Sequence, residues 1–127
     1  MLNSPYHAHI YFTDSDRAAA LALRDTFISR CKAEGPIVFV GATATGPVGP
    51  HPIPQYEVHF REQALGDVRA MLAGSGLTAL VHPLTRDDLA DHTTLGQWIG
   101  APVPLDLTAL DPPGVNQGIQ RFGVSDF

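Results

Sequence analysis

The stretches that decide the fold are residues 6–12, YHAHIYF, and residues 55–60, QYEVHF. In both, a hydrophobic side chain stands at every second position, with polar or ionisable side chains between. An alternation with a period of two predicts a β-strand with one apolar and one polar face. The polar faces carry His7, His9 and Tyr11 in the first strand and Gln55, Glu57 and His59 in the second.

Outward from these strands, helical and strand-like patterns alternate along the chain. Apolar residues at helical spacing predict helices over residues 18–28 and 63–72. Short apolar runs predict further strands over residues 37–40 and 77–82. The order strand, helix, strand, strand, helix, strand predicts an α+β fold, the ferredoxin-like β-α-β-β-α-β sandwich, with a C-terminal extension. Two helices then cover one face of a four-stranded antiparallel sheet, and the other face is left open or is covered by a partner chain.

Residues 1–110 are expected to form a single domain of this fold. Beyond Pro83 we expect a short helix over about residues 86–96 and an extended piece or turn over residues 105–110. The run Asp-Pro-Pro-Gly at residues 111–114 breaks the chain into a tail, residues 111–127, that could serve as a dimer arm.

The segment over residues 41–54 is rich in proline and glycine, which predicts a loop. A loop of this length in a compact domain is more often functional than idle. We expect it to cover a site and to limit the access of water.

Composition narrows the class of protein. The chain has 127 residues, 44% hydrophobic and 17% charged, which is typical of a folded globular domain. A net charge of -5 gives no reason to expect nucleic acid or an anionic membrane as a partner. The sequence shows neither a signal peptide nor a membrane-spanning apolar run, so we expect a cytoplasmic protein. The single cysteine, Cys31, excludes an intrachain disulfide and argues against a thiolate-rich zinc or iron–sulfur site.

Six histidines are the most informative residues for function, because five of them lie in or beside the predicted strands. We expect the first and third strands to be parallel neighbours, and the fourth strand to flank the first in antiparallel fashion. This pairing predicts a cluster at one edge of the exposed face, made of His7, His9, His51, Glu57 and His82. His59 would lie one step further along, and His59 and His92 have the weakest claim to be metal ligands.

Such a cluster has the composition of a catalytic metal site. Two histidines and a carboxylate suit non-heme Fe(II), and three histidines suit zinc. A single histidine is more often an ordinary hydrogen-bonded group, so the hypothesis depends on the joint placement of several. The competing interpretation is a non-catalytic dimeric protein of the same fold that binds a small ligand or zinc.

Four segments, HAHIYF, GPVGPHPIPQYEVHF, LTALVHP and DHTTLGQWIGAPVPLDLTAL, together resemble the DOPA 4,5-dioxygenase family. The resemblance covers about residues 6–110 and is carried by the order and spacing of these motifs. It implies a ferredoxin-like fold and extradiol cleavage of a catechol by O2 at a non-heme Fe(II) site. The histidines that match the family's motifs are His7, His9, His51, His82 and His92.

The resulting hypothesis assigns a role to each candidate residue. Fe(II) is held by His9, His82 and a third group, either His51 or Glu57, although zinc or another divalent metal could occupy a purified sample. The acid–base candidates are His7, His59 and His92. The expected partners are a small catechol-type substrate, O2 and a second copy of the chain in a homodimer.

Overall fold

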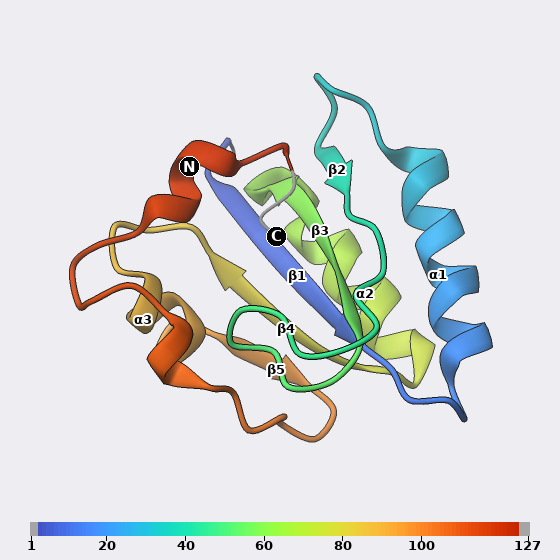
Figure 1. Cartoon of the computed structure of the whole chain (residues 1–127). Helices are drawn as coiled ribbons and strands as arrows, with labels where there is room; N and C mark the ends of the chain where they lie inside the picture. The colour runs from blue at the N-terminus through green and yellow to red at the C-terminus, as the bar shows by residue number, and fades with distance from the viewer. Residues whose placement is uncertain (1–2, 125–127) are drawn as a thin grey trace.

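The computed structural model describes residues 3–124 and is built on a five-stranded sheet (Figure 1). The strands lie in the order β2-β3-β1-β4-β5, and every neighbouring pair is antiparallel. The strands span Pro5–Tyr11 (β1), Ile37–Val40 (β2), Gln55–Arg61 (β3), Thr78–Pro83 (β4) and Gln97–Ile99 (β5). The helices span Arg17–Arg30 (α1), Leu65–Ser75 (α2) and Asp88–His92 (α3), with short 3₁₀ turns at Glu62–Ala64, Leu107–Ala109 and Gln117–Arg121. The predicted α+β fold with a ferredoxin-like core is confirmed.

The two long helices cover the apolar face of the sheet. Ala8 and Ile10 of β1 and Val58 of β3 are fully buried there, and they pack against Phe27 of α1 and Leu72 of α2. The alternation in the sequence therefore sets which face of each strand meets the helices. His7, His9, Glu57 and His59 accordingly point to the other face of the sheet.

The predicted parallel pairing of the first and third strands is wrong. β1 and β3 are antiparallel, with His7 opposite His59 and His9 opposite Glu57. The reason lies in the connections. The crossover through α1 returns β2 in the direction of β1, and the β2–β3 hairpin then reverses β3. His59 is therefore the direct neighbour of His7 and not a residue one step further along.

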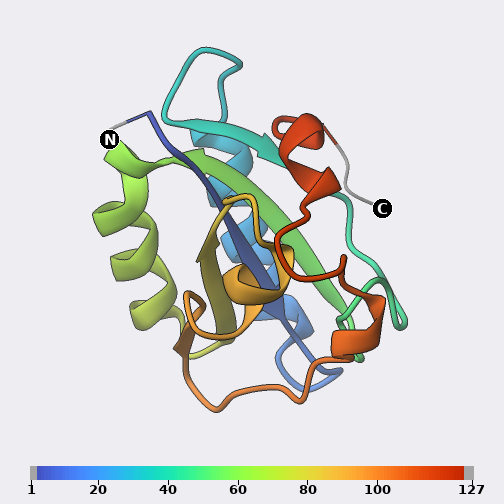
Figure 2. The same cartoon turned by 90° about the vertical axis from the view of Figure 1, so that its left-hand side faces the viewer.

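The second face of the sheet is not open, which corrects the expectation drawn from the sequence. The loop 41–54, α3 and the C-terminal segment, residues 111–124, lie across it, and all six histidines are buried. Figure 2 shows α2 on one side of β1 and β3 and the C-terminal segment on the other. A single chain therefore covers its own polar face.

The region after β4 differs most from the sequence-based expectation. The predicted helix over residues 86–96 is reduced to α3, and residues 97–99 add the edge strand β5, paired with β4. The expected turn over residues 105–110 contains the 3₁₀ turn Leu107–Ala109. Within residues 3–124, no helix is long and apolar enough to span a membrane.

Candidate metal centre

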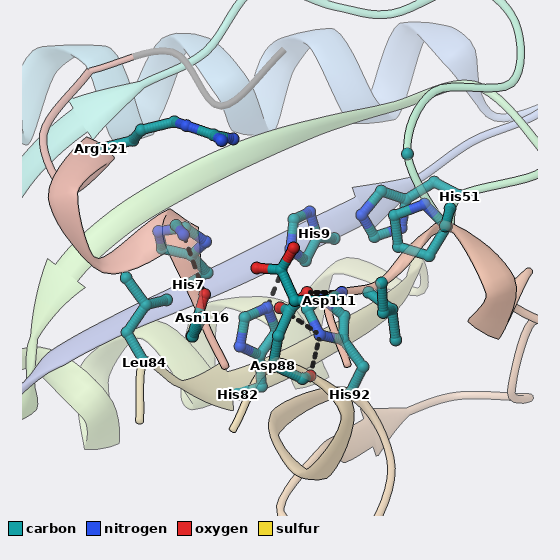
Figure 3. Close-up of a pocket in the computed structure, with 15 residues that line it drawn as sticks. His7, His9, His51, His82, Leu84, Asp88, His92, Asp111, Asn116 and Arg121 are labelled. Atoms are coloured by element: carbon teal, nitrogen blue, oxygen red, sulfur yellow. Dashed lines mark hydrogen bonds and ion pairs between the residues drawn. The ribbon is translucent and has the colours of Figure 1, made fainter. Parts of the chain in front are cut away.

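A pocket of about 200 Å³ lies on the covered face of the sheet, and five of the six histidines line it (Figure 3). They come from β1, from the end of β4, from α3 and from the loop before β3. These residues are His7, His9, His51, His82 and His92. A cavity of about 150 Å³ can hold a benzene ring, so the pocket has room for one small aromatic ring.

Strand pairing positions the centre of this cluster. His82 of β4 lies opposite His7 of β1, and His59 of β3 lies opposite His7 on the other side. Since side chains directly across an antiparallel pair share one face, these three histidines form a row across three strands. His9 lies two positions along β1 and so points to the same face.

Three pocket histidines are held by hydrogen bonds through Nδ1 to carbonyl oxygens. Nδ1 of His9 lies 3.1 Å from Oε1 of Gln55, and Nδ1 of His82 lies 2.7 Å from the carbonyl oxygen of Pro83. Nδ1 of His92 lies 2.8 Å from the carbonyl oxygen of Asp88. A carbonyl oxygen only accepts, so each Nδ1 carries the proton and each neutral ring keeps its lone pair on Nε2. This is the tautomer that binds a metal through Nε2.

The Nε2 atoms of His9 and His82 face each other at 3.0 Å. With both protons on Nδ1, two lone pairs point at one another, an arrangement that needs a shared proton or a bound cation. Neighbouring ligands of one ion, each bound at about 2.0–2.1 Å, lie roughly 3 Å apart. Within residues 3–124, the buried Nε2 of His7 also has no hydrogen-bond partner. The donor set therefore fits a metal ion.

In the described part of the chain, three groups of side chains place their ligand atoms within 4.8 Å of one another. They are His7–His9–His82, His9–His51–His92 and His7–Glu57–His59. In the third group the rings of His7 and His59 are stacked, with centroids 3.8 Å apart and an angle of 11° between planes. Lone pairs of stacked rings run side by side and do not converge on one ion, so this group is the poorest metal site of the three.

Glu57 and His59 are not among the residues that line the pocket. Nε2 of His59 lies 3.4 Å from Oε1 of Glu57. The backbone N–H of Gly123 donates to Nδ1 of His59 at 2.9 Å, so the ring proton of neutral His59 is on Nε2, towards Glu57. The ring of Phe122 is stacked on His59 from the C-terminal segment. The structure thus brings these two predicted site residues next to His7 but not to the pocket surface.

Burial is the main cause of the shifted pKa values of four of the five pocket histidines. It lowers the pKa of His7, His9 and His82 well below the usual value, and the neighbouring histidines add to the shift. Burial, followed by the charges of His92 and His82, lowers the pKa of His51 to about 3. These rings are neutral at pH 7, as a metal ligand must be.

His92 behaves differently from the other pocket histidines. Burial alone lowers its pKa, but the hydrogen bonds and the negative charge of Asp88 outweigh burial and raise the pKa above its ordinary value. Oδ1 of Asp88 lies 3.3 Å from Nδ1 of His92. The charge of a protonated His92 is therefore supported by a carboxylate one helical turn away.

Sequence reasoning missed several residues that shape the site. Asp88 of α3 orients His92, and Asn116 and Arg121 of the C-terminal segment line the pocket. Asn116 also donates to the carbonyl oxygen of Thr85 at 2.7 Å and to Asp91 at 3.1 Å, which ties the segment to α3. The spacing of Asp88 and His92 at i and i+4 was a usable signal, whereas nothing local in the sequence predicts the fold-back of residues 111–124.

The fold and the site define a class of small ferredoxin-like proteins in which buried histidines on one face of the sheet could hold a metal ion. The comparison with known families identifies the family. The model of the Dopa 4,5-dioxygenase family matches residues 6–109, and the chain belongs to this family.

Individual relatives support the assignment. The chain is 38% identical over 112 residues to DOPA 4,5-dioxygenase of Amanita muscaria, covering 83% of this chain and 49% of that protein. It is 30% identical over 117 residues to an uncharacterized 21.2 kDa protein of Botryotinia fuckeliana, covering 84% of this chain and 63% of that protein. The chain thus spans about half to two thirds of the length of these relatives.

A solved structure has the same fold. It is the crystal structure of a "putative dioxygenase" from Nostoc punctiforme, which superposes with a TM-score of 0.75 at 31% sequence identity. The similarity covers 84% of this chain and 90% of the other.

Proposed function

We propose that this protein is a metal-dependent extradiol dioxygenase that opens a catechol ring with O2, and that its metal is Fe(II). The observation that carries the proposal is the pair of Nε2 atoms of His9 and His82, 3.0 Å apart, each on a ring whose Nδ1 faces a carbonyl oxygen. Membership of the Dopa 4,5-dioxygenase family supports the reaction class.

Three residues would hold the metal: His9, His82 and His7. His7 completes the group because its buried Nε2 has no hydrogen-bond partner within residues 3–124, and its ring is tilted by 60° to 76° from the other two. The sequence suggested His51 or Glu57 as the third ligand. Glu57 lies beside His59 and does not line the pocket, and the hydrogen bond of His51 favours another role, described below.

A bound Fe(II) ion would supply the redox chemistry with O2 and would lower the pKa of the hydroxyls of a coordinated catechol. His92 lines the pocket with Nε2 as its unprotonated atom when the ring is neutral, and Asp88 stabilises its protonated form. His92 is therefore placed to take a proton from a catechol hydroxyl and to return it later in the reaction. His59 does not line the pocket and acts, in this proposal, by fixing the ring of His7 through stacking.

The covering segments would keep water from the reacting groups. Pro50 and His51 of the loop 41–54 form part of the pocket lining, as do residues of the C-terminal segment. Exclusion of water strengthens electrostatic interactions and prevents side reactions. Asn116 and Arg121 lie outside the part of the chain that matches the family, so we expect them to influence which catechol is accepted.

Oxygen uptake tests this function directly. Protein reconstituted anaerobically with Fe(II) is mixed with oxygenated buffer and L-DOPA, caffeate or protocatechuate, while a yellow ring-opened product is followed by absorbance. The expected result is O2 uptake in step with yellow product by the parent protein and none by His82→Ala. Iron bound in stoichiometric amount without O2 uptake for any catechol would contradict the proposal.

Zinc is the alternative that the ligand set itself favours, because three histidines are a common zinc site. A protein that binds zinc for a non-catalytic role would bind metal with the same residues and would show no oxygen chemistry. Comparing O2 uptake of the Fe(II)-loaded and Zn(II)-loaded protein separates the two, since only the iron form is expected to consume O2.

A further inference from the structure

Tyr11 and His51 form a buried pair at the edge of the pocket. Tyr11 ends β1, and His51 stands in the loop that leads into β3. Each is about 1% exposed, and the Tyr11 hydroxyl oxygen lies 2.6 Å from Nδ1 of His51. The position of the ring proton of His51 depends on which of the two atoms donates.

The hydroxyl is the donor in this pair. The ordinary pKa of a tyrosine hydroxyl is about 10, so the hydroxyl of Tyr11 carries its proton at neutral pH. A buried O–H needs an acceptor, and within residues 3–124 the hydroxyl of Tyr11 makes no hydrogen bond other than the one to His51. Nδ1 of His51 therefore accepts, and the proton of the neutral ring is on Nε2.

His51 is in this respect the reverse of its neighbours. Nδ1 of His9, His82 and His92 faces a carbonyl oxygen and carries the proton, which leaves Nε2 as the lone-pair atom. The contrast follows from the partners. A carbonyl oxygen can only accept, so the ring facing it donates, whereas the buried hydroxyl of Tyr11 donates to His51, so the ring of His51 accepts. The pocket thus contains histidines in two opposite tautomers.

We propose that Tyr11 is a positioning residue that holds His51 in the Nε2–H tautomer, so that His51 is a hydrogen-bond donor of the pocket and not a metal ligand. This inference deepens the proposed function. It rests on that function only for the group that accepts the hydrogen bond of His51, which would be an oxygen atom of the bound catechol or of O2. Such a donor stabilises negative charge that develops on oxygen.

The tautomer can be measured without turnover. In metal-free protein labelled with ¹⁵N in its histidines, we expect His51 to show a protonated Nε2 and an unprotonated Nδ1. In Tyr11→Phe, which removes only the hydroxyl, we expect the Nδ1–H form of His51 to appear. A protonated Nδ1 on His51 in the parent protein overturns the proposal.

Metal stoichiometry gives the second readout. We expect His51→Gln, whose amide can still donate a hydrogen bond, to bind as much Fe(II) or Zn(II) as the parent, and His82→Ala to bind none. Loss of metal from His51→Gln to the level of His82→Ala would show that His51 is a ligand and overturn the proposal.

Turnover separates this inference from the proposed function. With a catechol that the parent protein cleaves, Tyr11→Phe is expected to lose about tenfold or more in kcat with unchanged metal content. An unchanged kcat in Tyr11→Phe overturns the positioning role. Absence of turnover in the parent, together with the Nε2–H tautomer and metal retention in His51→Gln, would instead refute the dioxygenase and leave the assignment of His51 standing.

Discussion

At the scale of single residues, the chemistry of the site depends on which ring nitrogen of each pocket histidine carries the proton and which carries the lone pair. His9 and His82 are oriented by Gln55 and by the carbonyl of Pro83, neither of which lines the pocket. Partners of this kind fix the ring orientation and raise the basicity of a ligand. Their presence favours a metal site over a chance gathering of imidazoles.

A matched pair of variants tests the ligand assignment. His82→Ala removes a proposed ligand, whereas His59→Gln alters a histidine that is equally buried but does not line the pocket. We expect His82→Ala to lose metal completely and His59→Gln to retain the stoichiometry of the parent, measured by elemental analysis after dialysis. Circular dichroism serves as the control for folding, and equal metal content in the two variants would contradict the assignment.

The residue types were readable from the sequence, but their partners were not. The alternation in YHAHIYF placed His7 and His9 on one face, and the structure agrees. The sequence could not decide whether Glu57 or His51 is a metal ligand. The roles of these residues depend on distant contacts: the Tyr11 hydroxyl, 40 positions away, contacts His51, and the backbone N–H of Gly123 contacts His59, the neighbour of Glu57. Contacts of this range follow from the packing of whole elements and not from local pattern.

At the scale of elements, the sheet holds the proposed ligands and the C-terminal segment closes over them. Phe122 stacks on His59 and Gly123 donates to the same ring, while Asn116 ties the segment to α3. The predicted boundary at residue 110 separates these two parts. It stays a prediction until the shorter chain is made.

Ending the chain after Leu110 tests both the boundary and the role of the segment. All five pocket histidines are kept, so we expect the short chain to fold and still to bind metal. Loss of partners outside the ligand sphere typically lowers metal affinity by about 10–100-fold, so we expect the short chain to lose its metal to a chelator faster than the full chain. A release rate equal to that of the full chain would show that residues 111–124 do not protect the site.

Element order was predictable, whereas strand direction was misjudged. Helical spacing predicts both long helices, and period-two alternation and short apolar runs each predict two of the strands. The predicted parallel pairing of β1 and β3 is wrong because the crossover through α1 and the β2–β3 hairpin together require the antiparallel arrangement. β5 is only three residues long, and a run of that length carries no periodicity.

At the scale of the whole molecule, the cluster links stability to pH. The pKa values of His7, His9, His51 and His82 are lowered from 6.5 in the folded state, by burial first. Between pH 6.5 and the lowered values, the unfolded chain binds more protons than the folded chain, so the free energy of unfolding falls as the pH falls. The raised pKa of His92 acts the other way, since its contribution is present below pH 6.5 and lost as the pH rises through the folded value.

The four histidines with lowered pKa values outnumber His92, whose pKa is raised, so we expect the free energy of unfolding to decrease in acid. For metal-free protein, we expect Tm to decrease steadily from about pH 7 to pH 5, with uptake of more than one proton on unfolding. Scanning calorimetry across this range measures the dependence. A Tm that is constant, or that rises towards pH 5, would show that the buried histidines are protonated in the folded protein.

The homodimer stays a prediction, but the structure removes the reason for it. It was suggested by an open sheet face, and that face is covered by the loop 41–54, α3 and residues 111–124 of the same chain. Light scattering at several concentrations measures the oligomeric state. A monomer would be in keeping with a site that is complete within one chain.

The close contact between Nε2 of His9 and Nε2 of His82 has a thermodynamic consequence for the molecule. An ion that binds the folded chain there, and binds the unfolded chain weakly, shifts the folding equilibrium by mass action, by about 2.7 kcal/mol at a free concentration 100 times Kd. We expect Tm to rise with added Fe(II) or Zn(II) in the parent and to stay level in His82→Ala. The amount of folded protein in a cell would then follow the supply of free metal.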